Sequence, residues 1–413
     1  MNKAPHIAII GAGIVGVSTA IWAQRAGARV TLIDREGPAA GTSYGNAGLL
    51  AATAVVPVAV PGLMRKAPGM LLDPNQPLFL RWSYLPRLFT WLRRFLSHAT
   101  APEVDRISAA LTGLLADTVD QHRNLAEGTV AARFIKDGDW VFGYADKKAF
   151  EKDHYSWRIR RQNGYECIEM EPDAIAAYDP ALAGKFGYAV RCTNHGFISD
   201  PGAYVTALAD HFVAEGGELT IADVSGFDIA AGKVRAVQTA IGLIEVDHAI
   251  VTAGVWSQQL GGGAPIKLDS ERGYHVEFVN ASVQLTSPLM HAAGKFGVTP
   301  MEGRLRCAGT VELGGIDKPP SKAPIELLKR NALELFPDMT YDRIDTWMGH
   351  RPSTTDSLPV IGQAPAAQNL WLGYGHQHIG LTGGPKTGRW LAQMVMGQNP
   401  NVDLSPFDPT RRG

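Results

Sequence analysis

The sequence predicts a protein of the α/β class that carries a second domain of the α+β type. The chain opens with an apolar strand, a glycine-rich turn, a helix and a second strand. Two later stretches, one after residue 247 and one after residue 369, again place small residues directly after a short apolar strand. Strand-like runs lie between these stretches, and 413 residues are enough for two domains with cores of their own.

The first 35 residues predict one βαβ unit, with a strand at 6–10, a turn at 11–13, a helix at 14–25 and a strand at 29–33. Gly11, Gly13 and Gly16 form G-x-G-x-x-G: the first permits the turn, the second lets a pyrophosphate approach, and the third lets helix and strand pack closely. Asp34 ends the second strand, where an acid can hydrogen-bond ribose hydroxyls. This pattern indicates a Rossmann-like dinucleotide site, with further contacts from Ile14, Val15 and Arg35. It does not separate FAD from NAD.

The loop "GPAAGTSYGNAGLL", residues 37–50, is the second element. Its small residues favour backbone N–H groups laid along a phosphate or a flat ring, although such a loop can also be a plain surface connection. The expected contacts are Thr42, Ser43, Asn46, Ala47 and Gly48.

The stretch "DHAIVTAGVWSQQL" predicts a buried strand at 248–251, a small-residue turn and a helix. Small residues at a strand end allow a ligand to lie against the backbone at the carboxyl edge of the sheet. The expected cofactor contacts in this region are Val224, Thr252, Ala253, Gly254 and Trp256.

Near the C-terminus, "NLWLGYGHQHIGLTGG" predicts a strand at 370–372 and a last helix that starts near Ile379. A helix N-terminus directed at a flavin would stabilise the negative charge that develops on reduction, whereas a nicotinamide has no such need. This difference favours FAD. The contacts expected here are Gly375, His376, Ile379, Gly380, Leu381 and Thr382.

Together these motifs, with "DPGAYVTAL", "RGYHVEF" and "GHRPSTTDSLPVIG", resemble the D-amino-acid oxidase/glycine oxidase superfamily, and most of all the bacterial D-amino-acid dehydrogenases. The resemblance covers nearly the whole chain in matching order. It implies an FAD enzyme. We expect FAD to be held noncovalently, because the stretches near Arg351 carry no cysteine and Cys307 lies in a strand-like run.

Arg351 lies in "MGHRPSTTDSLPVIG", residues 348–362, which has no apolar period typical of a helix or strand face. The resemblance implies that Arg351 binds the substrate carboxylate, which a planar guanidinium matches with two hydrogen bonds. The other interpretation is a loop cap or an ion pair with Asp356. His378 occupies the place where glycine oxidases carry an arginine, so Arg351 would hold the carboxylate nearly alone.

Three tyrosines are candidates to present a hydroxyl to the substrate, and each also suits a packing role. Tyr274 is the first choice, with Tyr374 and Tyr44 behind it. No metal ligands are expected.

The resemblance implies oxidation of a free D-amino acid to the 2-oxo acid through the imine, by hydride transfer from Cα to flavin N5. No indispensable general base is expected. The electrons would pass to a non-oxygen acceptor such as quinone or the respiratory chain. Two alternatives stay open: a dehydrogenase of D-hydroxyproline, D-proline or another secondary amine, and a flavoprotein subunit that needs partner chains.

The order of motifs predicts a discontinuous FAD-binding domain made of residues 1–84, 197–262 and 346–413. The substrate-binding domain would comprise 85–196 and 263–345, built on an antiparallel sheet formed by runs such as "YHVEFV", "KFGVTP" and "RLRCAGTVEL", followed by a helix near 322–336.

A net charge of −1 gives no general reason to bind nucleic acid and counts against an RNA-modifying oxidase. Three scattered cysteines suit neither a disulfide framework nor a zinc site, so all three are interpreted as packed thiols in a reducing, cytoplasmic compartment. Residues 78–100 predict an amphipathic helix that either packs on its own core or touches an anionic membrane at the inner face of the cell membrane. Its expected apolar stripe is Leu85, Leu88, Phe89, Leu92, Phe95 and Leu96, with Arg87, Arg93 and Arg94 elsewhere on its surface.

Overall fold

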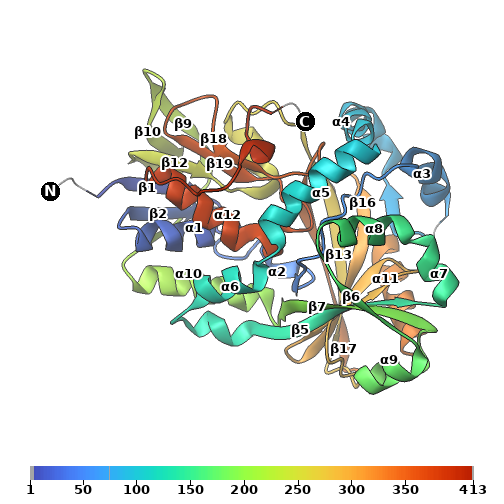
Figure 1. Ribbon diagram of the computed structural model, residues 1–413. Helices are drawn as coiled ribbons and strands as arrows, with labels where there is room; N and C mark the ends of the chain where they lie inside the picture. The colour runs from blue at the N-terminus through green and yellow to red at the C-terminus, as the bar shows by residue number, and fades with distance from the viewer. Residues whose placement is uncertain (1–3, 74, 412–413) are drawn as a thin grey trace.

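Two large β-sheets organise the molecule, and helices cover their outer sides (Figure 1). The structure is a computed structural model that describes residues 4–73 and 75–411. It confirms the expected α/β class, with a Rossmann-like unit at the N-terminus and a mainly antiparallel second sheet.

The first sheet has six strands in the order β18-β19-β12-β1-β2-β8, all parallel except β18. Helices α1 (Ile14–Arg25) and α12 (Gly380–Val395) pack against each other beside it. They approach closely because Gly388 has no side chain: a Cβ there would lie 2.6 Å from Cβ of Ser18. The strands are β1 (His6–Ile10), β2 (Arg29–Asp34), β8 (Glu218–Ile221), β12 (His248–Val251), β18 (Val360–Gln363) and β19 (Leu370–Tyr374).

A small antiparallel sheet, β11-β10-β9, shares a hydrophobic core with the first sheet. Its strands are β9 (Val224–Ala230), β10 (Lys233–Thr239) and β11 (Gly242–Glu245).

The second sheet has ten strands, eight of them in the order β17-β13-β16-β15-β14-β5-β7-β3, while β4 pairs with β16 and β6 with β7. Helix α11 (Lys322–Leu335) packs against β13 and β16. The strands are β3 (Leu49–Leu50), β4 (Leu78–Leu80), β5 (Ile135–Tyr144), β6 (Cys167–Met170), β7 (Tyr188–Ile198), β13 (Leu268–Val279), β14 (Leu289–His291), β15 (Phe296–Met301), β16 (Arg304–Leu313) and β17 (Arg343–Thr354).

The remaining helices lie between these strands. They are α2 (Thr42–Gly45), α3 (Leu63–Leu72), α4 (Leu85–Ser97), α5 (Ala101–Leu115), α6 (Thr118–Ala126), α7 (Lys147–Lys152), α8 (His154–Gln162), α9 (Pro172–Tyr178) and α10 (Pro201–Ala214). Five short 3-10 turns also occur in the described residues, at Trp82–Tyr84, Val130–Phe134, Pro180–Leu182, Gly254–Leu260 and Ser405–Phe407.

Two segments differ from what their sequence pattern indicates. Residues 348–354, which have no apolar period typical of a strand face, form the C-terminal part of β17, because residues 268–274 of β13 pair with them. A strand that is hydrogen-bonded along a long partner does not need a strong apolar period of its own. The helix predicted after the strand at 248–251 forms as a 3-10 helix, Gly254–Leu260, and the segment is bounded by Gly254 and Gly261, both at positive φ.

The predicted domain limits stay a prediction, but three segments placed in the first domain belong to the second sheet. These are β3, β4 and most of β17. They connect the two sheets, and β17 brings residues 349–352 to the end of the second sheet that lies next to the glycine-rich turn.

The interpretation of the cysteines as three packed thiols was wrong for two of them. Cys167 and Cys192 stand directly opposite each other on β6 and β7 and form a disulfide. Cys307 is free and buried. The pairing depends on strand register, which a separation of 25 residues in the sequence does not reveal.

Helix α4 forms as predicted and packs on its own small core, but its buried stripe differs from the one expected. Leu88, Trp91 and Phe95 are buried, whereas Phe89 is 62% exposed. The indole N–H of Trp91 donates to the carbonyl of Ser353, which anchors the helix to β17. Within the described residues, no helix combines the length and the apolar character that spanning a bilayer requires.

Candidate functional site

A cavity of about 580 Å³ lies where the carboxyl ends of β1, β2, β12 and β19 meet β13, β16 and β17. The carboxyl edge of a parallel sheet is the usual ligand position in such folds. One wall is therefore Rossmann-like and the opposite wall is the face of an antiparallel sheet.

The three motif glycines differ in what a side chain at each position would meet. Gly11 has φ +105°, and a Cβ there would lie 2.6 Å from the carbonyl oxygen of Thr252. A Cβ on Gly16 would lie 1.8 Å from the carbonyl oxygen of Gly11, so helix and turn are in direct backbone contact. Gly13 meets only Ser43 Oγ, at 3.1 Å, and borders the cavity. Of the three glycines, only Gly13 has open space where its side chain would be, and a ligand could occupy that space.

Asp34 and Ser43 shape the turn before α1. Asp34 Oδ2 accepts the N–H of Ala12 at 2.7 Å, and its Oδ1 accepts those of Glu36 and Gly37. Ser43 Oγ accepts the N–H of Ile14 at 2.9 Å, which ties the 37–50 loop to the helix start. These bonds hold the acid at the cavity wall.

The N-termini of α1 and α12 both face the cavity without a side-chain cap from their own N-cap residues. First-turn N–H groups have no partner inside a helix, so a ligand with phosphate or carbonyl oxygens would satisfy them. A cavity with two such ends, an acid after β2 and a flat sheet face fits FAD.

The guanidinium of Arg351 lies on the β17 face that borders the cavity. It rests over Gly273, where a Cβ would be 2.5 Å from Cζ. Its one hydrogen bond among described residues runs from Nη1 to the carbonyl of Thr310, at 3.4 Å. Burial lowers the pKa of Arg351, and the nearby Glu271 carboxylate opposes that shift. Asp356 pairs instead with Arg411, at 2.7 Å, so the alternative ion pair does not form.

Two histidines that line the cavity, His376 and His378, are held in the neutral form. Burial, with the charge of Arg351, lowers the pKa of His378 to about 4. Burial lowers the pKa of His376 to about 3, and its Nε2 lies 2.9 Å from Thr387 Oγ1. His378 lines the cavity. It offers one N–H donor and one acceptor at neutral pH.

Two of the three candidate tyrosines, Tyr274 and Tyr374, border the cavity but direct the hydroxyl elsewhere or pack in the core. The third, Tyr44, does not line this cavity and is 43% exposed. The Tyr274 hydroxyl donates to Glu312 and accepts the N–H of Ser321, within a buried network that includes Arg272. Its prediction as a substrate-facing hydroxyl was wrong, because the strand turns this side chain toward α11. The ring of Tyr374 is buried in the core beneath the first sheet.

Most of the predicted cofactor residues line this cavity. Four of them do not line it and belong to the structure around it: Gly16, Gly48, Ile379 and Thr382. Thr382 Oγ1, for example, donates to the carbonyl of Leu49. Sequence reasoning missed several lining residues on the second sheet and the last loop, among them Gly273, Ala308, Gly309, Trp347 and Gln377. No local sequence pattern distinguishes these residues, because only the strand pairing brings them to the cavity.

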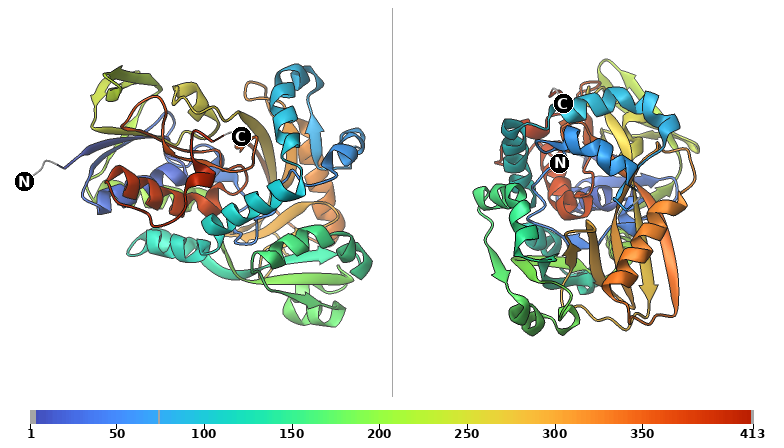
Figure 2. Two further views of the ribbon diagram at one scale, coloured as in Figure 1. Left: turned by 45° about the horizontal axis from the view of Figure 1, so that its top comes forward. Right: turned by 90° about the vertical axis from the view of Figure 1, so that its right-hand side faces the viewer.

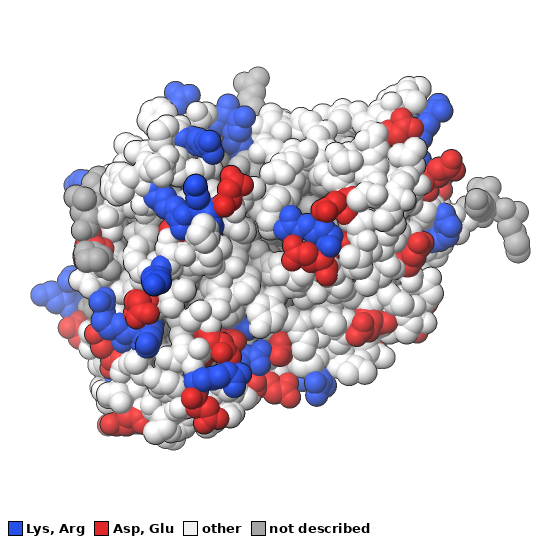
Figure 3. All heavy atoms as spheres, turned by 180° about the vertical axis from the view of Figure 1, so that it is seen from behind, with Lys and Arg blue, Asp and Glu red and all other residues white. Residues whose placement is uncertain are grey.

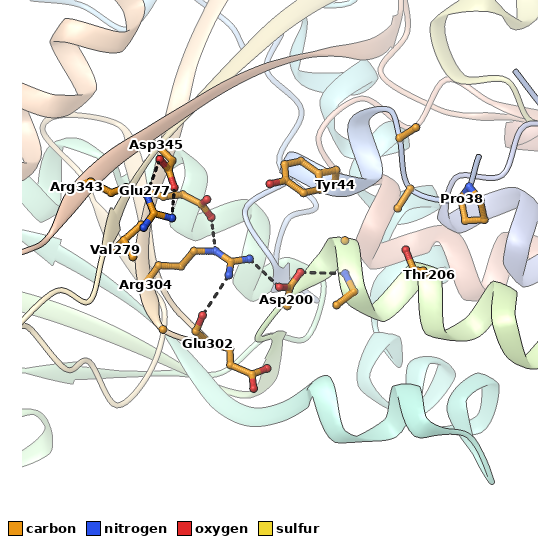
Figure 4. A pocket seen from close by; sticks show the side chains of 15 residues that line it. Pro38, Tyr44, Asp200, Thr206, Glu277, Val279, Glu302, Arg304, Arg343 and Asp345 are labelled. Atoms are coloured by element: carbon orange, nitrogen blue, oxygen red, sulfur yellow. Dashed lines mark hydrogen bonds and ion pairs between the residues drawn. The ribbon is translucent and has the colours of Figure 1, made fainter. Parts of the chain in front are cut away.

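A second hollow, of about 640 Å³, lies on the surface between Tyr44, the start of α10 and the far ends of β13 and β17 (Figure 4). Most of its charged side chains form ion pairs with one another: Arg304 binds Asp200 and Glu277, and Arg343 binds Asp345. Although it is slightly larger than the first cavity, it holds none of the glycine-motif residues and not Arg351. We place the chemistry in the first cavity. In the described residues, no group of three or more His, Cys, Asp or Glu is arranged to hold a metal.

Comparison with known proteins assigns the chain to one family. The family described as "FAD dependent oxidoreductase" matches residues 6–394. The chain belongs to this family. It is 40% identical to a D-amino-acid oxidase of Bradyrhizobium diazoefficiens over the whole of both chains. It is 27% identical to a D-amino acid dehydrogenase of Rhizobium rhizogenes, over 98% of this chain and 100% of the relative.

The fold is also that of a solved glycine oxidase from Geobacillus kaustophilus, with a TM-score of 0.75 and 20% identity over 99% of this chain and 100% of the other. The protein is therefore an FAD-dependent oxidoreductase, and the first cavity is the candidate site for its cofactor.

Proposed function

We propose that this enzyme oxidises a free D-amino acid to the 2-oxo acid, with Arg351 holding the substrate carboxylate. The observation that carries the proposal is an arginine side chain at the cavity wall whose one hydrogen bond, among described residues, is a long one to a backbone carbonyl. The guanidinium borders the cavity, and among the described residues it forms no ion pair, with the Glu271 carboxylate nearby but not paired to it. A substrate carboxylate in the cavity would give it a close partner. The D configuration is supported by the names of the relatives in Bradyrhizobium and Rhizobium.

The residues around Arg351 suit orientation rather than proton abstraction. A bidentate guanidinium fixes the plane of the carboxylate and thereby the direction of the Cα–H bond. His378, neutral at pH 7, can donate to the carboxylate or accept from the amino group. Bound FAD supplies the acceptor for the hydride. The chain needs only to bind the neutral amine and to admit water to the imine, so no indispensable general base is required.

Anaerobic bleaching of the flavin absorbance tests this proposal directly. The panel contains D-amino acids, the matching L-amino acids, glycine, D-proline and D-hydroxyproline. Fast bleaching by a primary D-amino acid, with the 2-oxo acid as product, supports the proposal. Preference for D-hydroxyproline would assign a cyclic secondary amine instead. A protein that holds FAD but is bleached by no compound contradicts the proposal and favours a subunit that needs a partner chain.

We further propose that the electrons pass to an acceptor at a membrane, such as quinone. The protein would dock on that membrane with the end of the molecule that carries α3 and α4. Residues 37–102 contain six Lys or Arg and one acid, Asp73, in a chain whose net charge is −1. Trp82 and Phe89, seven residues apart, are 60% and 62% exposed, and Met64 is 66% exposed. Lys and Arg outnumber acids over this end in the rear view (Figure 3, upper left), and α3 and α4 lie together in both views of Figure 2. Exposed aromatic residues among basic ones suit an anionic lipid surface.

Co-sedimentation with vesicles tests the docking. We expect binding to vesicles that contain phosphatidylglycerol, and much weaker binding to pure phosphatidylcholine or after Trp82→Ser with Phe89→Ser. Ile241, 69% exposed on the far small sheet, provides a matched control, because Ile241→Ser should change nothing. Equal binding by all variants contradicts this docking surface. Reoxidation by oxygen as fast as by a quinone analogue contradicts the proposed acceptor.

A further inference from the structure

Helix α12 contains a proline, Pro385, in its second turn. In an α-helix the N–H of residue 385 would donate to the carbonyl of Leu381, four residues earlier. Proline has no N–H, and its ring crowds that same carbonyl. The Leu381 carbonyl therefore lacks its helical donor, and Leu381 itself lines the FAD cavity.

The side chain of His122 occupies the position of the missing donor. Its Nε2 lies 2.9 Å from the carbonyl oxygen of Leu381, and the residue is completely buried on α6. A carbonyl only accepts, so Nε2 carries the proton. Nδ1 is then an acceptor, and it lies 2.8 Å from the hydroxyl of Tyr204 on α10, which donates to it.

These two hydrogen bonds connect α10 to α6 and α6 to α12, and each of their polar groups has a defined partner. Tyr204 is fully buried, so its hydroxyl has no access to water as an alternative. Breaking the hydrogen bond between His122 and Leu381 would leave a buried imidazole N–H and a buried carbonyl unpaired. Both groups would then have lost their water without gaining a partner, so the loss in stability would be large.

The same helix, α6, binds the next carbonyl of α12 as well. Thr118 Oγ1 donates to the carbonyl of Thr382 at 2.7 Å. Two consecutive carbonyls in the first turn are thus held by one neighbouring helix, which runs close to α12 in Figures 1 and 2. The orientation of that turn decides where its free N–H groups point in the cavity.

We propose that His122 is a positioning residue for the cofactor: it supplies the hydrogen bond that Pro385 removes from α12 and so holds the uncapped first turn toward FAD. His122 does not line the cavity and acts only through Leu381. The inference concerns cofactor binding, and it does not depend on which substrate the enzyme oxidises.

A rescue experiment tests this directly. His122→Phe keeps a ring of similar size and removes the donor. We expect it to raise the FAD dissociation constant about 10-fold, as measured by quenching of flavin fluorescence on adding FAD to the apoprotein. Pro385→Ala restores a backbone N–H to residue 385. In that background the His122→Phe change should raise the constant less than about 3-fold, because the helix then supplies its own donor.

Hydrogen exchange gives the second measurement. The backbone N–H groups of residues 383 and 384 should exchange faster in His122→Phe than in the native protein, and should regain protection in the double variant. A merely structural role for His122 predicts equal losses of FAD affinity with and without Pro385→Ala, and that result overturns the proposal. So does native affinity in His122→Phe. If His122→Phe does not fold, a folded double variant that binds FAD supports the proposal. A double variant that fails to fold where Pro385→Ala folds overturns it.

Discussion

The guanidinium of Arg351 lies over Gly273 of the neighbouring strand. It fits there because glycine has no Cβ, which would otherwise take up the same space. The register places Glu271 directly opposite Arg351, so Gly273 is its diagonal neighbour on the same sheet face. Because strand residues alternate between faces, this arrangement requires the pairing of β13 with β17.

Gly273→Ala should therefore displace the proposed anchor without unfolding the protein. A Cβ 2.5 Å from Cζ forces the flexible end of Arg351 to move, while the backbone of residue 273 needs no positive φ. We expect kcat/KM for the substrate to fall roughly 10- to 100-fold, since small displacements of an orienting group are costly. Steady-state kinetics with a flavin spectrum as the control measures this. Unchanged kinetics would mean that the guanidinium is not used in this position.

Arg351→Lys should raise KM by roughly two orders of magnitude while FAD stays bound. A lysine keeps the positive charge but loses the planar pair of donors that orients a carboxylate. Substrate titrations together with the flavin absorbance at saturating protein separate the two effects. Loss of FAD in this variant would instead assign Arg351 to the cofactor. An unchanged KM would exclude it from carboxylate binding.

Two of the motif glycines should respond differently to alanine. Gly16→Ala places a Cβ 1.8 Å from a backbone oxygen, which cannot move cheaply, and should cost ~3 kcal/mol or more of folding free energy. Gly13→Ala meets only the Ser43 side chain and should leave the apoprotein stable while weakening FAD binding. Urea unfolding and FAD titration of both variants make the comparison. Equal destabilisation by the two substitutions would contradict the roles assigned here.

Acid should destabilise the protein well above the range in which carboxylates titrate. Burial lowers the pKa of His122 to about 4 and that of His376 to about 3. In the unfolded chain both have a pKa near 6.5. Between pH 6.5 and 4 the unfolded state binds protons that the native state does not, so stability falls as the pH drops through this window.

From pH 7 to pH 5 each of these two histidines should remove ~2 kcal/mol from the free energy of unfolding. Urea titrations at the two pH values measure the change, and His122→Gln should lessen it because that side chain does not titrate. A free energy of unfolding that stays constant from pH 7 to pH 5 would show that these imidazoles are not buried in the neutral form.

Thiol counting tests the disulfide. Under denaturing conditions without reductant, one thiol per chain, that of Cys307, should react with an alkylating reagent, and three should react after reduction. In the native protein Cys307 should stay unreactive, since burial raises the pKa of its thiol to about 12. Three reactive thiols without reductant would restore the interpretation of all the cysteines as free thiols.

The sequence by itself determined the cofactor half of the site. Gly11, Gly13, Gly16 and Asp34 lie within one contiguous βαβ unit, so spacing along the chain translates directly into positions in space. The predicted strand at 248–251 and the helix start near residue 380 have the same local character, and both were confirmed.

The proposed substrate half of the site was decided by tertiary structure. Residues 348–354 carry no strand signal of their own and become β17 through pairing with β13. That register places Arg351 over Gly273, turns Tyr274 toward Glu312, and brings Trp347 to the cavity wall. The pairing of β13 with β17, the Cys167–Cys192 bond and the contact of His122 with Leu381 join residues that are between 25 and 259 positions apart. Local periodicity carries no information about such partners, because side-chain contacts across elements depend on register and packing rather than on the residues next in the chain.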